Sequence, residues 1–383
     1  FLAKATFVAM GGAVHVFKPR SSGEGLGRAW YPPWNSGSSA YFTLKAGAEM
    51  TCQEVRFIPV RFKDAYGPVG AWFLLFKSRA TNAFGGEYMV ERRDELQNWQ
   101  PYGLVKPIPA NLRNWLGMLD VMEGKGPIYM RTEEALQKIA DEYKDDQKAY
   151  KKKMKELESE AWEDFLDMTI SQAILWAASD VQPEEKSSEI AAAEPYFIGS
   201  HSGASGAWVS GPEDLAPADY FWGYENMCTT KGVFAAGDAS GASSHKFSSG
   251  SHAEGRIAGK AAIRYLVNEN PAMPTVDDAT IEKLKAETLK PLDLYEEHKG
   301  FTSQTDVNPN YILPKMFMFR LQKLMDEYAG GVGAQFTTSQ KLCERGLELL
   351  AMLKEDATNL GASDLHELMR CWENVHRMYQ AEA

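Results

Sequence analysis

A stretch dense in glycine and serine, Gly199–Gly259, constrains this chain of 383 residues more than any other part of it. Within this stretch, KGVFAAGDASG (Lys231–Gly241) is typical of a short apolar strand that ends in Gly-Asp. A carboxylate at the end of a strand, where glycine lets the backbone come close, suits a ribityl or ribose hydroxyl of a nucleotide cofactor. The small residues of SSHKFSSGSHAEGRIAGKAAIRYL follow and lead into a helix that we expect to start near His252.

Taken together, the strand, the turn and the helix predict a flavin site. Small side chains let a flat ring lie against the backbone, and a helix N-terminus stabilises negative charge at the N1/O2 edge of a flavin. Either piece alone also fits a simpler interpretation, a Ser/Gly-rich turn followed by an ordinary helix. The two in tandem fit a flavin better.

Composition and charge exclude several other classes of protein. Apolar residues make up 44% of the chain and charged residues 24%, which excludes bulk disorder, collagen-like sequence and a disulfide scaffold. The net charge of -11 argues against wholesale binding to nucleic acid or to an anionic membrane. An anionic ligand therefore needs a local basic pocket.

Cysteine usage indicates a reducing, cytoplasmic environment. The four cysteines, which lie far apart, are Cys52, Cys228, Cys343 and Cys371. They form no CxxC or CxxH pair, so this chain alone predicts no zinc or iron-sulfur site. No run of about 18 apolar residues is present that would predict a membrane span.

The remaining patterns predict the secondary structure. Strand-like runs are expected at 1–10, which Gly11-Gly12 closes, at 55–62 and at 71–76. Residues 107–130, punctuated by Pro and Gly, are expected to be connecting structure, and 132–180 one or two helices. SSGEGLGR at 21–28 is expected to be a glycine-rich turn, and the helix that follows it is expected to end near 46–50. Helices are also expected after Pro271, at 280–289, 313–328, 339–354 and 363–379.

Long motifs then identify a family. The chain closely resembles the alpha subunit of dissimilatory adenylylsulfate reductase, a flavoprotein of the fumarate reductase/succinate dehydrogenase superfamily. The motifs that carry the resemblance are KGVFAAGDASGASSHKFSSGSHAEGRIAGKAA, GSHSGASGAWVSGPEDLAP, RFKDAYGPVGAWFLLFK, GRAWYPPWNSGS and YGLVKPIP.

The resemblance implies a fold with three parts. We expect an α/β FAD-binding domain that is partial and discontinuous (1–57 and 197–275), an inserted α+β capping domain (58–196), and a helical C-terminal domain (276–383). Family members carry an N-terminal GxGxxG unit that holds the FAD pyrophosphate, and no GxGxxG occurs here. We therefore expect the chain to be the middle and later portion of such a subunit.

The resemblance also assigns cofactor-binding residues. Gly11 and Gly12 lie where a strand end contacts FAD in the superfamily, with Met10 in place of the usual Thr. Asp238 matches the acidic residue that holds the FAD ribityl chain. The pyrimidine edge of the flavin is assigned to Ser248, Ser249, Gly250 and Ser251.

The substrate residues separate this chain from the dicarboxylate enzymes. Where those enzymes have Glu-Phe-x-Gln-Phe-His-Pro-Thr, this chain has QEVRFIPV, so Ile58 replaces the substrate His and Arg56 replaces the Gln. A sulfated nucleotide needs a cation for its anion and an aromatic or aliphatic clamp for its adenine. Nearby basic and aromatic residues that suit it are Arg61, Lys63, Trp30, Trp34 and Trp72.

By similarity to the family, Arg61 and His201 lie next to the reacting sulfur. Trp30, Leu74 and Phe247 lie around the flavin and adenine, and Lys246 aligns roughly with a substrate arginine of the superfamily. The alternatives are a surface arginine at 61, a turn-capping histidine at 201 and core aromatics. For His245 and His252, structural hydrogen bonding and contact with reactants both stay open.

The resemblance implies FAD-dependent reduction of adenylylsulfate (APS) to sulfite and AMP, or the reverse, through a flavin N5-sulfite adduct. It also implies an iron-sulfur beta subunit with two [4Fe-4S] clusters as partner, and an indirect link to a membrane electron-transfer complex is compatible with it. One alternative is a fumarate reductase/succinate dehydrogenase or L-aspartate oxidase-like flavoprotein. Another, of a different class, is a non-catalytic fragment unable to hold FAD alone.

Overall fold

The computed structural model describes most of the chain, and its contacts divide the chain into two compact units. Unit 1 comprises Phe1–Phe57 with Pro195–Ala383, and unit 2 comprises Ile58–Glu194. The structure describes residues 2–19, 32, 34–63, 69–101, 103, 105, 108–165, 167–193, 195–197, 204–242, 246–304 and 307–383. Trp30, His201, His245 and the expected turn at 21–28 lie outside these residues.

Short strand pairs form the sheet structure of unit 1. The expected N-terminal strand is present as β1 (Thr6–Val8), which pairs in parallel with β10 (Val233–Ala235). Two antiparallel pairs accompany it: β2 (Met50–Thr51) with β9 (Gly206–Ala207), and β3 (Arg56–Phe57) with β8 (Tyr196–Phe197). The first half of the unit also contains α2 (Ser38–Lys45), which ends just before the predicted boundary.

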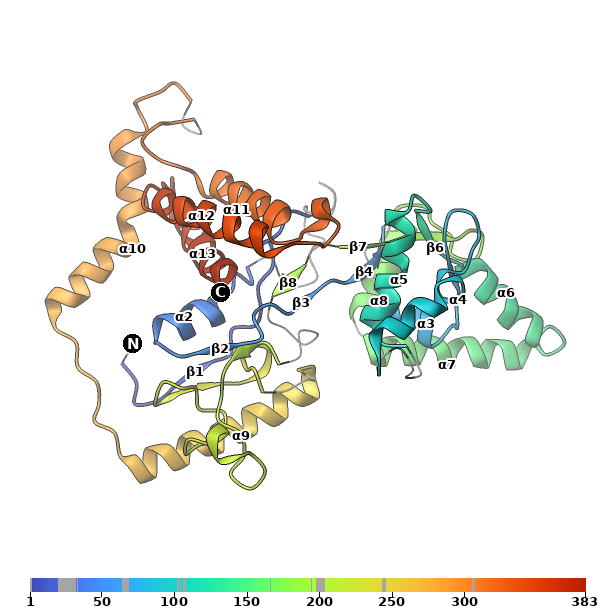
Figure 1. Cartoon of the computed structure of the whole chain (residues 1–383), viewed down its shortest axis with the longest axis horizontal. Helices are drawn as coiled ribbons and strands as arrows, with labels where there is room; N and C mark the ends of the chain where they lie inside the picture. The colour runs from blue at the N-terminus through green and yellow to red at the C-terminus, as the bar shows by residue number, and fades with distance from the viewer. Residues whose placement is uncertain are drawn as a thin grey trace. The chain divides into compact units, whose positions relative to one another are not determined.

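The C-terminal half of unit 1 is helical, as the sequence predicts. After α9 (Ser248–Glu269) come four helices, of which α11, α12 and α13 lie side by side (Figure 1). The side chains of Asp277, Ser339 and Asp364 cap three of these helices. Each accepts a hydrogen bond from a backbone N–H group in the first turn. The four helices are α10 (Asp278–His298), α11 (Pro314–Tyr328), α12 (Gln340–Ala357) and α13 (Leu365–Glu382).

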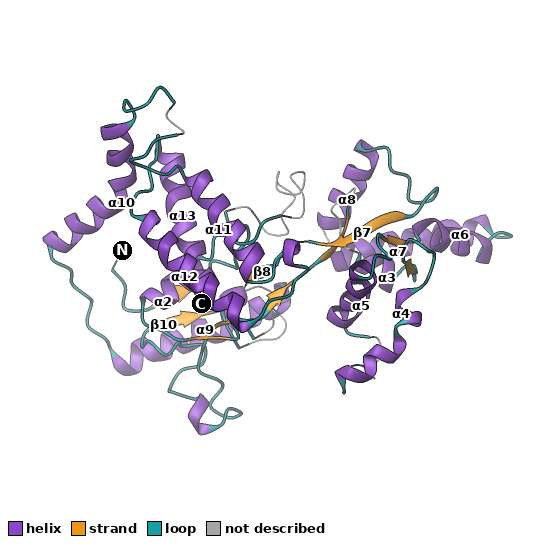
Figure 2. Ribbon diagram, turned by 45° about the horizontal axis from the view of Figure 1, so that its top comes forward, coloured by secondary structure: helices purple, strands orange, loops and turns teal. Residues whose placement is uncertain are grey.

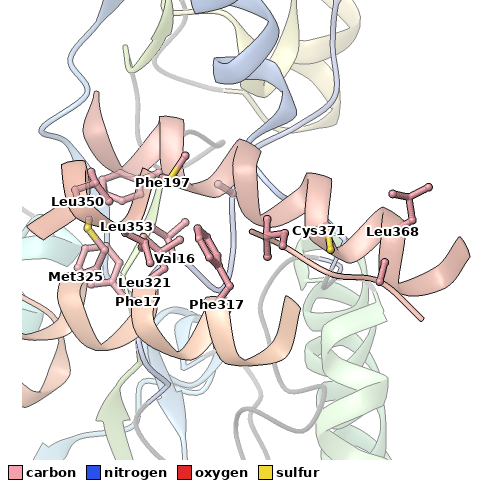
Figure 3. Close-up of a cluster of buried hydrophobic side chains, with 14 residues drawn as sticks. Val16, Phe17, Phe197, Phe317, Leu321, Met325, Leu350, Leu353, Leu368 and Cys371 are labelled. Atoms are coloured by element: carbon pink, nitrogen blue, oxygen red, sulfur yellow. The ribbon is translucent and has the colours of Figure 1, made fainter. Parts of the chain in front are cut away.

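An apolar core joins these helices to the first half of the chain. In Figure 3, Phe317 and Leu321 of α11 and Leu353 of α12 point toward Val16 and Phe17, which follow β1. Phe17, Phe317 and Leu321 are fully buried. Residues more than 300 positions apart in the sequence therefore form one core, and burial of this apolar stripe holds the helices in place.

Unit 2 contains a four-stranded antiparallel sheet with helices packed against it. The strand order is β4-β7-β6-β5, and these strands are orange among purple helices in Figure 2. The core gathers Phe62, Trp72, Met130 and Trp176. The strands are β4 (Val60–Phe62), β5 (Ala80–Thr81), β6 (Ile128–Met130) and β7 (Ser188–Ala192), and the helices are α3 (Gly70–Leu74), α4 (Tyr88–Glu91), α5 (Ala110–Met122), α6 (Thr132–Glu142), α7 (Gln147–Phe165) and α8 (Asp167–Ala178).

The described residues also form several short helical turns. Unit 2 contains η1 (Arg93–Trp99), and unit 1 contains η3 (Ala218–Tyr220), η4 (Gly237–Ala239) and η5 (Val332–Ala334).

The prediction of a strand at 71–76 is wrong, because most of this run lies in the helix α3. The run AWFLLF contains no β-branched residue, and a short apolar run cannot be assigned by pattern alone. Trp72 lies within α3 and Phe76 lies just after its end, and their rings stack with centroids 4.6 Å apart.

The interpretation of 107–130 as connecting structure is also wrong. These residues contain α5, which is 13 residues long, and β6. Pro109 precedes the first turn of α5 and Gly124, with φ of 79°, follows its end. The Pro and Gly residues therefore mark the ends of a helix rather than its absence. The described residues of the region 132–180 form α6, α7 and α8, where one or two helices were expected.

All four cysteines are free thiols: Cys228 and Cys371 are buried, Cys52 is half-buried and Cys343 is exposed. Among the described residues, every helix is too short or too polar to cross a bilayer.

Candidate cofactor site

The glycine-rich edge of unit 1 is formed where β1 and β10 end. Because the two strands are parallel, with Val8 opposite Ala235, their carboxyl ends meet at the same edge. Gly11 follows β1 with φ of 75°, and Gly237 follows β10 with φ of 64°. Both values lie in the left-handed region that favours glycine. The two predicted cofactor segments, Gly11-Gly12 and Gly237-Asp238, therefore leave neighbouring strand ends.

Hydrogen bonds with two charged side chains fix the backbone of the turn η4. The Gly237 N–H donates to Oε2 of Glu254 over 2.7 Å, and both groups are buried. Nζ of Lys246 donates to the carbonyl oxygen of Ser205 and, over 3.5 Å, to that of Asp238. The turn is thus held by Glu254 of α9 and by Lys246, which lies just before that helix. We call Gly237, Asp238, Lys246, Ser251 and Glu254 the Asp238 cluster.

Close packing leaves little room for a side chain at Gly237. A Cβ atom built there would lie 3.2 Å from Oγ of Ser251, which itself donates to the Lys246 carbonyl over 2.6 Å. The start of α9 therefore packs directly on the turn that carries Asp238.

Burial shifts the pKa values of Lys246 and Asp238, and the neighbouring charges oppose these shifts. Burial lowers the pKa of Lys246 to about 8, although the carboxylates of Asp238 and Glu254 oppose this shift. Burial raises the pKa of Asp238, and the Lys246 charge opposes that rise. Among the described residues, no hydrogen-bond donor reaches the Asp238 carboxylate, although its own backbone carbonyl is engaged.

The helix α9 begins at Ser248, four residues earlier than expected. Ser248, Ser249, Gly250 and Ser251 therefore form its first turn rather than a loop that leads into it. The N-cap residue is Phe247, whose side chain offers no acceptor for the backbone N–H groups at this end. Together with the helix dipole, these N–H groups can stabilise a negatively charged ligand atom.

Other predicted residues lie elsewhere in the chain. Arg61 is in unit 2, on β4 opposite Ala191, and its side chain is only 3% exposed. Leu74 ends α3 in the same unit and is 49% exposed. Phe247 is 42% exposed next to the Asp238 cluster.

Two residues of the proposed nucleotide set have other surroundings. Trp72 is packed in the core of unit 2, and Lys63 forms an exposed ion pair with Glu189 over 2.7 Å. Arg56 donates to the carbonyls of Ala329, Gly330 and Phe336, so it connects β3 to the end of α11. Its guanidinium thus stabilises the structure of unit 1.

Sequence reasoning missed Glu254 and Ser205 as parts of this site. Glu254 is the one acidic residue in the first eleven residues of α9, and it lies three positions after Ser251 on the same helix face. An isolated acidic residue near the start of this helix could have indicated that Glu254 belongs to the site. Ser205 acts through its backbone carbonyl, which no side-chain pattern reveals.

Comparison with known proteins identifies the relatives of this chain. No family model matches it. The chain is 50% identical to the adenylylsulfate reductase subunit alpha of Megalodesulfovibrio gigas over an alignment of 388 residues, which covers 99% of this chain. The chain is therefore homologous to adenylylsulfate reductase alpha subunits. It spans 57% of the length of this curated relative.

Solved structures agree with this relationship. The adenylylsulfate reductase of the hyperthermophilic Archaeoglobus fulgidus matches with a TM-score of 0.92 and 53% identity, covering 99% of this chain and 59% of the other. A structure of adenosine-5-phosphosulfate reductase in complex with sulfite, described as a covalent adduct, matches with a TM-score of 0.91 and 53% identity over 99% of this chain and 58% of that one.

A more distant likeness shows the fold alone. A quinol-fumarate reductase structure matches with a TM-score of 0.57 at 16% identity, over 99% of this chain and 57% of that one. The expectation of an adenylylsulfate reductase relative with the fold of the fumarate reductase flavoproteins is thus confirmed.

Proposed function

We propose that this chain is the flavin- and substrate-binding part of an adenylylsulfate reductase alpha subunit, which interconverts APS with sulfite and AMP. The observation that carries the proposal is 50% identity to such a subunit along 99% of the chain, joined to the Asp238 cluster. In this proposal residues 1–57 and 197–275 bind FAD, 58–196 form the capping domain and 276–383 the helical domain.

The Asp238 cluster fits the ribityl and ring portions of FAD. The Asp238 carboxylate would accept a hydrogen bond from a ribityl hydroxyl, while Glu254 and Lys246 hold the turn that carries Asp238. The uncapped first turn of α9 would donate N–H groups to the pyrimidine edge of the ring. Gly11, Gly12 and Gly237 leave the backbone open at the same edge.

The flavin, when bound, supplies the two electrons that the sulfur of APS gains. The task of the chain is to position the substrate and to stabilise charge. Arg61 would neutralise the sulfonyl oxygens while AMP leaves, and His201 would donate a hydrogen bond or proton to the same group. Trp30, Leu74 and Phe247 would enclose the flavin and the adenine.

A partner must return electrons to the flavin. The relative from M. gigas is named as an alpha subunit, which implies at least one other subunit in that enzyme. We propose that an iron-sulfur beta subunit fills this role here, in the cytoplasm.

A fumarate reductase-like activity is the second candidate, because the fold is shared with quinol-fumarate reductase. The residues weigh against it. Ile58 replaces the substrate histidine of those enzymes, and the Arg56 guanidinium is bound to three backbone carbonyls.

The test is sulfite titration of the flavin-loaded protein with AMP present, followed by flavin absorbance. We expect sulfite to decrease the absorbance of the wild type and Arg61→Ala to need about tenfold more sulfite, because a charge-assisted contact worth about 1.4 kcal/mol is lost. Arg79→Ala is the matched control, since Arg79 is an exposed arginine of unit 2 that pairs with Glu134.

Two results would contradict the proposal. A flavin spectrum unaffected by sulfite, but changed by fumarate, would favour the second candidate. An undiminished response in Arg61→Ala would remove the role given to that residue.

A further inference from the structure

A cavity with several charged lining residues lies in unit 1, and its lining includes none of the residues of the Asp238 cluster. Its volume is about 390 Å³, which lies within the range of about 300–1,000 Å³ typical of small-molecule sites. It is formed by α11, α13 and two residues that follow β1. The lining residues are His15, Pro19, Pro314, Lys315, Met318, Phe319, Gln322, His366, Glu367, Arg370, Asn374 and Arg377.

Helical spacing explains why these side chains share one cavity. On α11 the lining residues recur at 315, 318, 319 and 322, and on α13 at 366, 367, 370, 374 and 377. Each set is one face of its helix. The face of α13 is polar and charged, whereas the face of α11 carries Lys315 and Gln322 beside the apolar Met318 and Phe319.

Positive charge dominates the lining. Lys315, Arg370 and Arg377 oppose a single lining carboxylate, Glu367. Oε2 of Glu367 is already engaged at the start of α13, where it accepts from the N–H and the hydroxyl of Ser363.

Two of the cations, Arg370 and Lys315, have N–H groups that can donate further hydrogen bonds. Arg370 pairs with Glu373 through Nη2 over 2.7 Å, but its buried Nε–H meets no acceptor. Among the described residues, Lys315 has no carboxylate within ion-pair distance and lies 5.8 Å from the centroid of the Phe319 ring. An anion that entered the cavity would offer acceptors to both.

The floor of the cavity is polar and buried. Arg377 is 2% exposed, donates to the Val14 carbonyl over 2.9 Å and to Oδ1 of Asn374 over 3.1 Å, and lies 3.9 Å from Glu373. Burial and the Arg377 charge lower the pKa of His15 to about 4, so its imidazole is neutral at neutral pH. Arg377 therefore adds a guanidinium to the wall that Lys315 and Arg370 form.

Apolar side chains form the rest of the wall. Pro19, Met318 and Phe319 lie beside the cations, and the volume exceeds what one small inorganic ion needs. The cavity can therefore enclose a charged group together with an organic portion.

We propose that this cavity, bordered by Lys315, Arg370 and Arg377, is a binding site for a phosphate-bearing small molecule, separate from the site of the proposed reaction. The phosphate oxygens accept from Arg370 and Lys315, and the organic portion lies against Met318 and Phe319. Free phosphate and a phosphomonoester share the recognised group, so both are used as probes.

The experiment measures binding of inorganic phosphate and of phenyl phosphate to the purified protein by isothermal titration calorimetry, at constant ionic strength set with sodium chloride. The test variant is Lys315→Gln/Arg370→Gln. The matched control is Lys323→Gln/Arg345→Gln, which removes one exposed lysine from α11 and one exposed arginine from α12, each paired with a carboxylate on its own helix outside the cavity.

We expect both probes to bind the wild type and the control alike, and the test variant at least about tenfold more weakly, the factor that corresponds to one lost charge-assisted contact. Tighter binding of phenyl phosphate identifies a phosphomonoester as the ligand class, and equal binding identifies free phosphate. Lys315→Gln alone, at an exposed position, should weaken binding even if the double variant folds poorly.

Two results overturn the proposal. One is no detectable binding of either probe to the wild type. The other is undiminished binding in the folded test variant, which would place the bound phosphate elsewhere on the protein.

Discussion

Two regions of unit 1 are held together in opposite ways. The core shared by α11, α12 and α13 consists of apolar side chains such as Phe317, Leu321 and Leu353. The Asp238 cluster consists of glycine, small residues and buried charges joined by individual hydrogen bonds. The core gains free energy from buried area, which is non-directional, whereas the cluster depends on the geometry of a few atoms. The core therefore supplies stability and the cluster supplies a defined surface for a ligand.

The largest expected effect comes from the core. Phe317→Ala should lower the free energy of unfolding by about 3–5 kcal/mol, because a fully buried ring is replaced by a cavity. Phe301→Ala, at a position 67% exposed, should change it by less than about 0.5 kcal/mol. Urea denaturation measures both. A similar loss in the two variants would mean that the apolar core is not what stabilises this region.

The next effect tests the hydrogen bond between Glu254 and Gly237. Glu254→Ala leaves a buried N–H without its acceptor and should lower the free energy of unfolding by about 2–3 kcal/mol. Glu254→Gln keeps an acceptor oxygen and should lose less than half as much. Equal losses in urea denaturation would show that the charge of Glu254, rather than its hydrogen bond, matters.

A third effect follows from the buried ammonium of Lys246. Its pKa falls from 10.5 to about 8 in the folded protein, so between these values the unfolded state binds more protons and stability rises with pH. Relative to Lys246→Met, the free energy of unfolding of the wild type should rise by about 2 kcal/mol from about pH 7.5 to about pH 9.5. Parallel pH profiles for the two proteins would contradict the burial of the charge.

The smallest effect compares two glycines. Gly237→Ala should destabilise by about 1–2 kcal/mol, because φ is 64° and a Cβ would lie 3.2 Å from Oγ of Ser251. Gly255→Ala should stabilise by about 0.5–1 kcal/mol, since it lies within α9 with nothing within 4 Å of the added Cβ. Thermal denaturation of the two variants should therefore give shifts of opposite sign.

The same contrast explains what the sequence could predict. The helices α11, α12 and α13 follow from their apolar periodicity, and β10 with its Gly-Asp end follows from KGVFAAGDASG. The predicted helix at 280–289 is present in α10, which continues through Pro291 to His298. The short run at 71–76 and the region 107–130 were assigned wrongly, because aromatic residues and Gly/Pro punctuation each suit more than one structure.

Within the candidate site, sequence reasoning predicted Asp238 but not what holds it. The bond from Gly237 to Glu254 and the bond from Lys246 to Ser205 join residues 17 and 41 positions apart. Such pairs depend on how α9 packs on the turn, which no local pattern encodes. Lys246 was predicted to contact substrate, and in the structure its ammonium donates to backbone carbonyls.

The central claim is that the Asp238 carboxylate holds the flavin, and the affinity for FAD tests it most directly. Titration of the apoprotein with FAD, followed by flavin fluorescence, gives the dissociation constant for the wild type, for Asp238→Ala and for Asp219→Ala, an exposed aspartate of η3. The account predicts at least about tenfold weaker binding for Asp238→Ala, which corresponds to one charge-assisted hydrogen bond, and no change for Asp219→Ala. Equal affinity of Asp238→Ala and the wild type would contradict it.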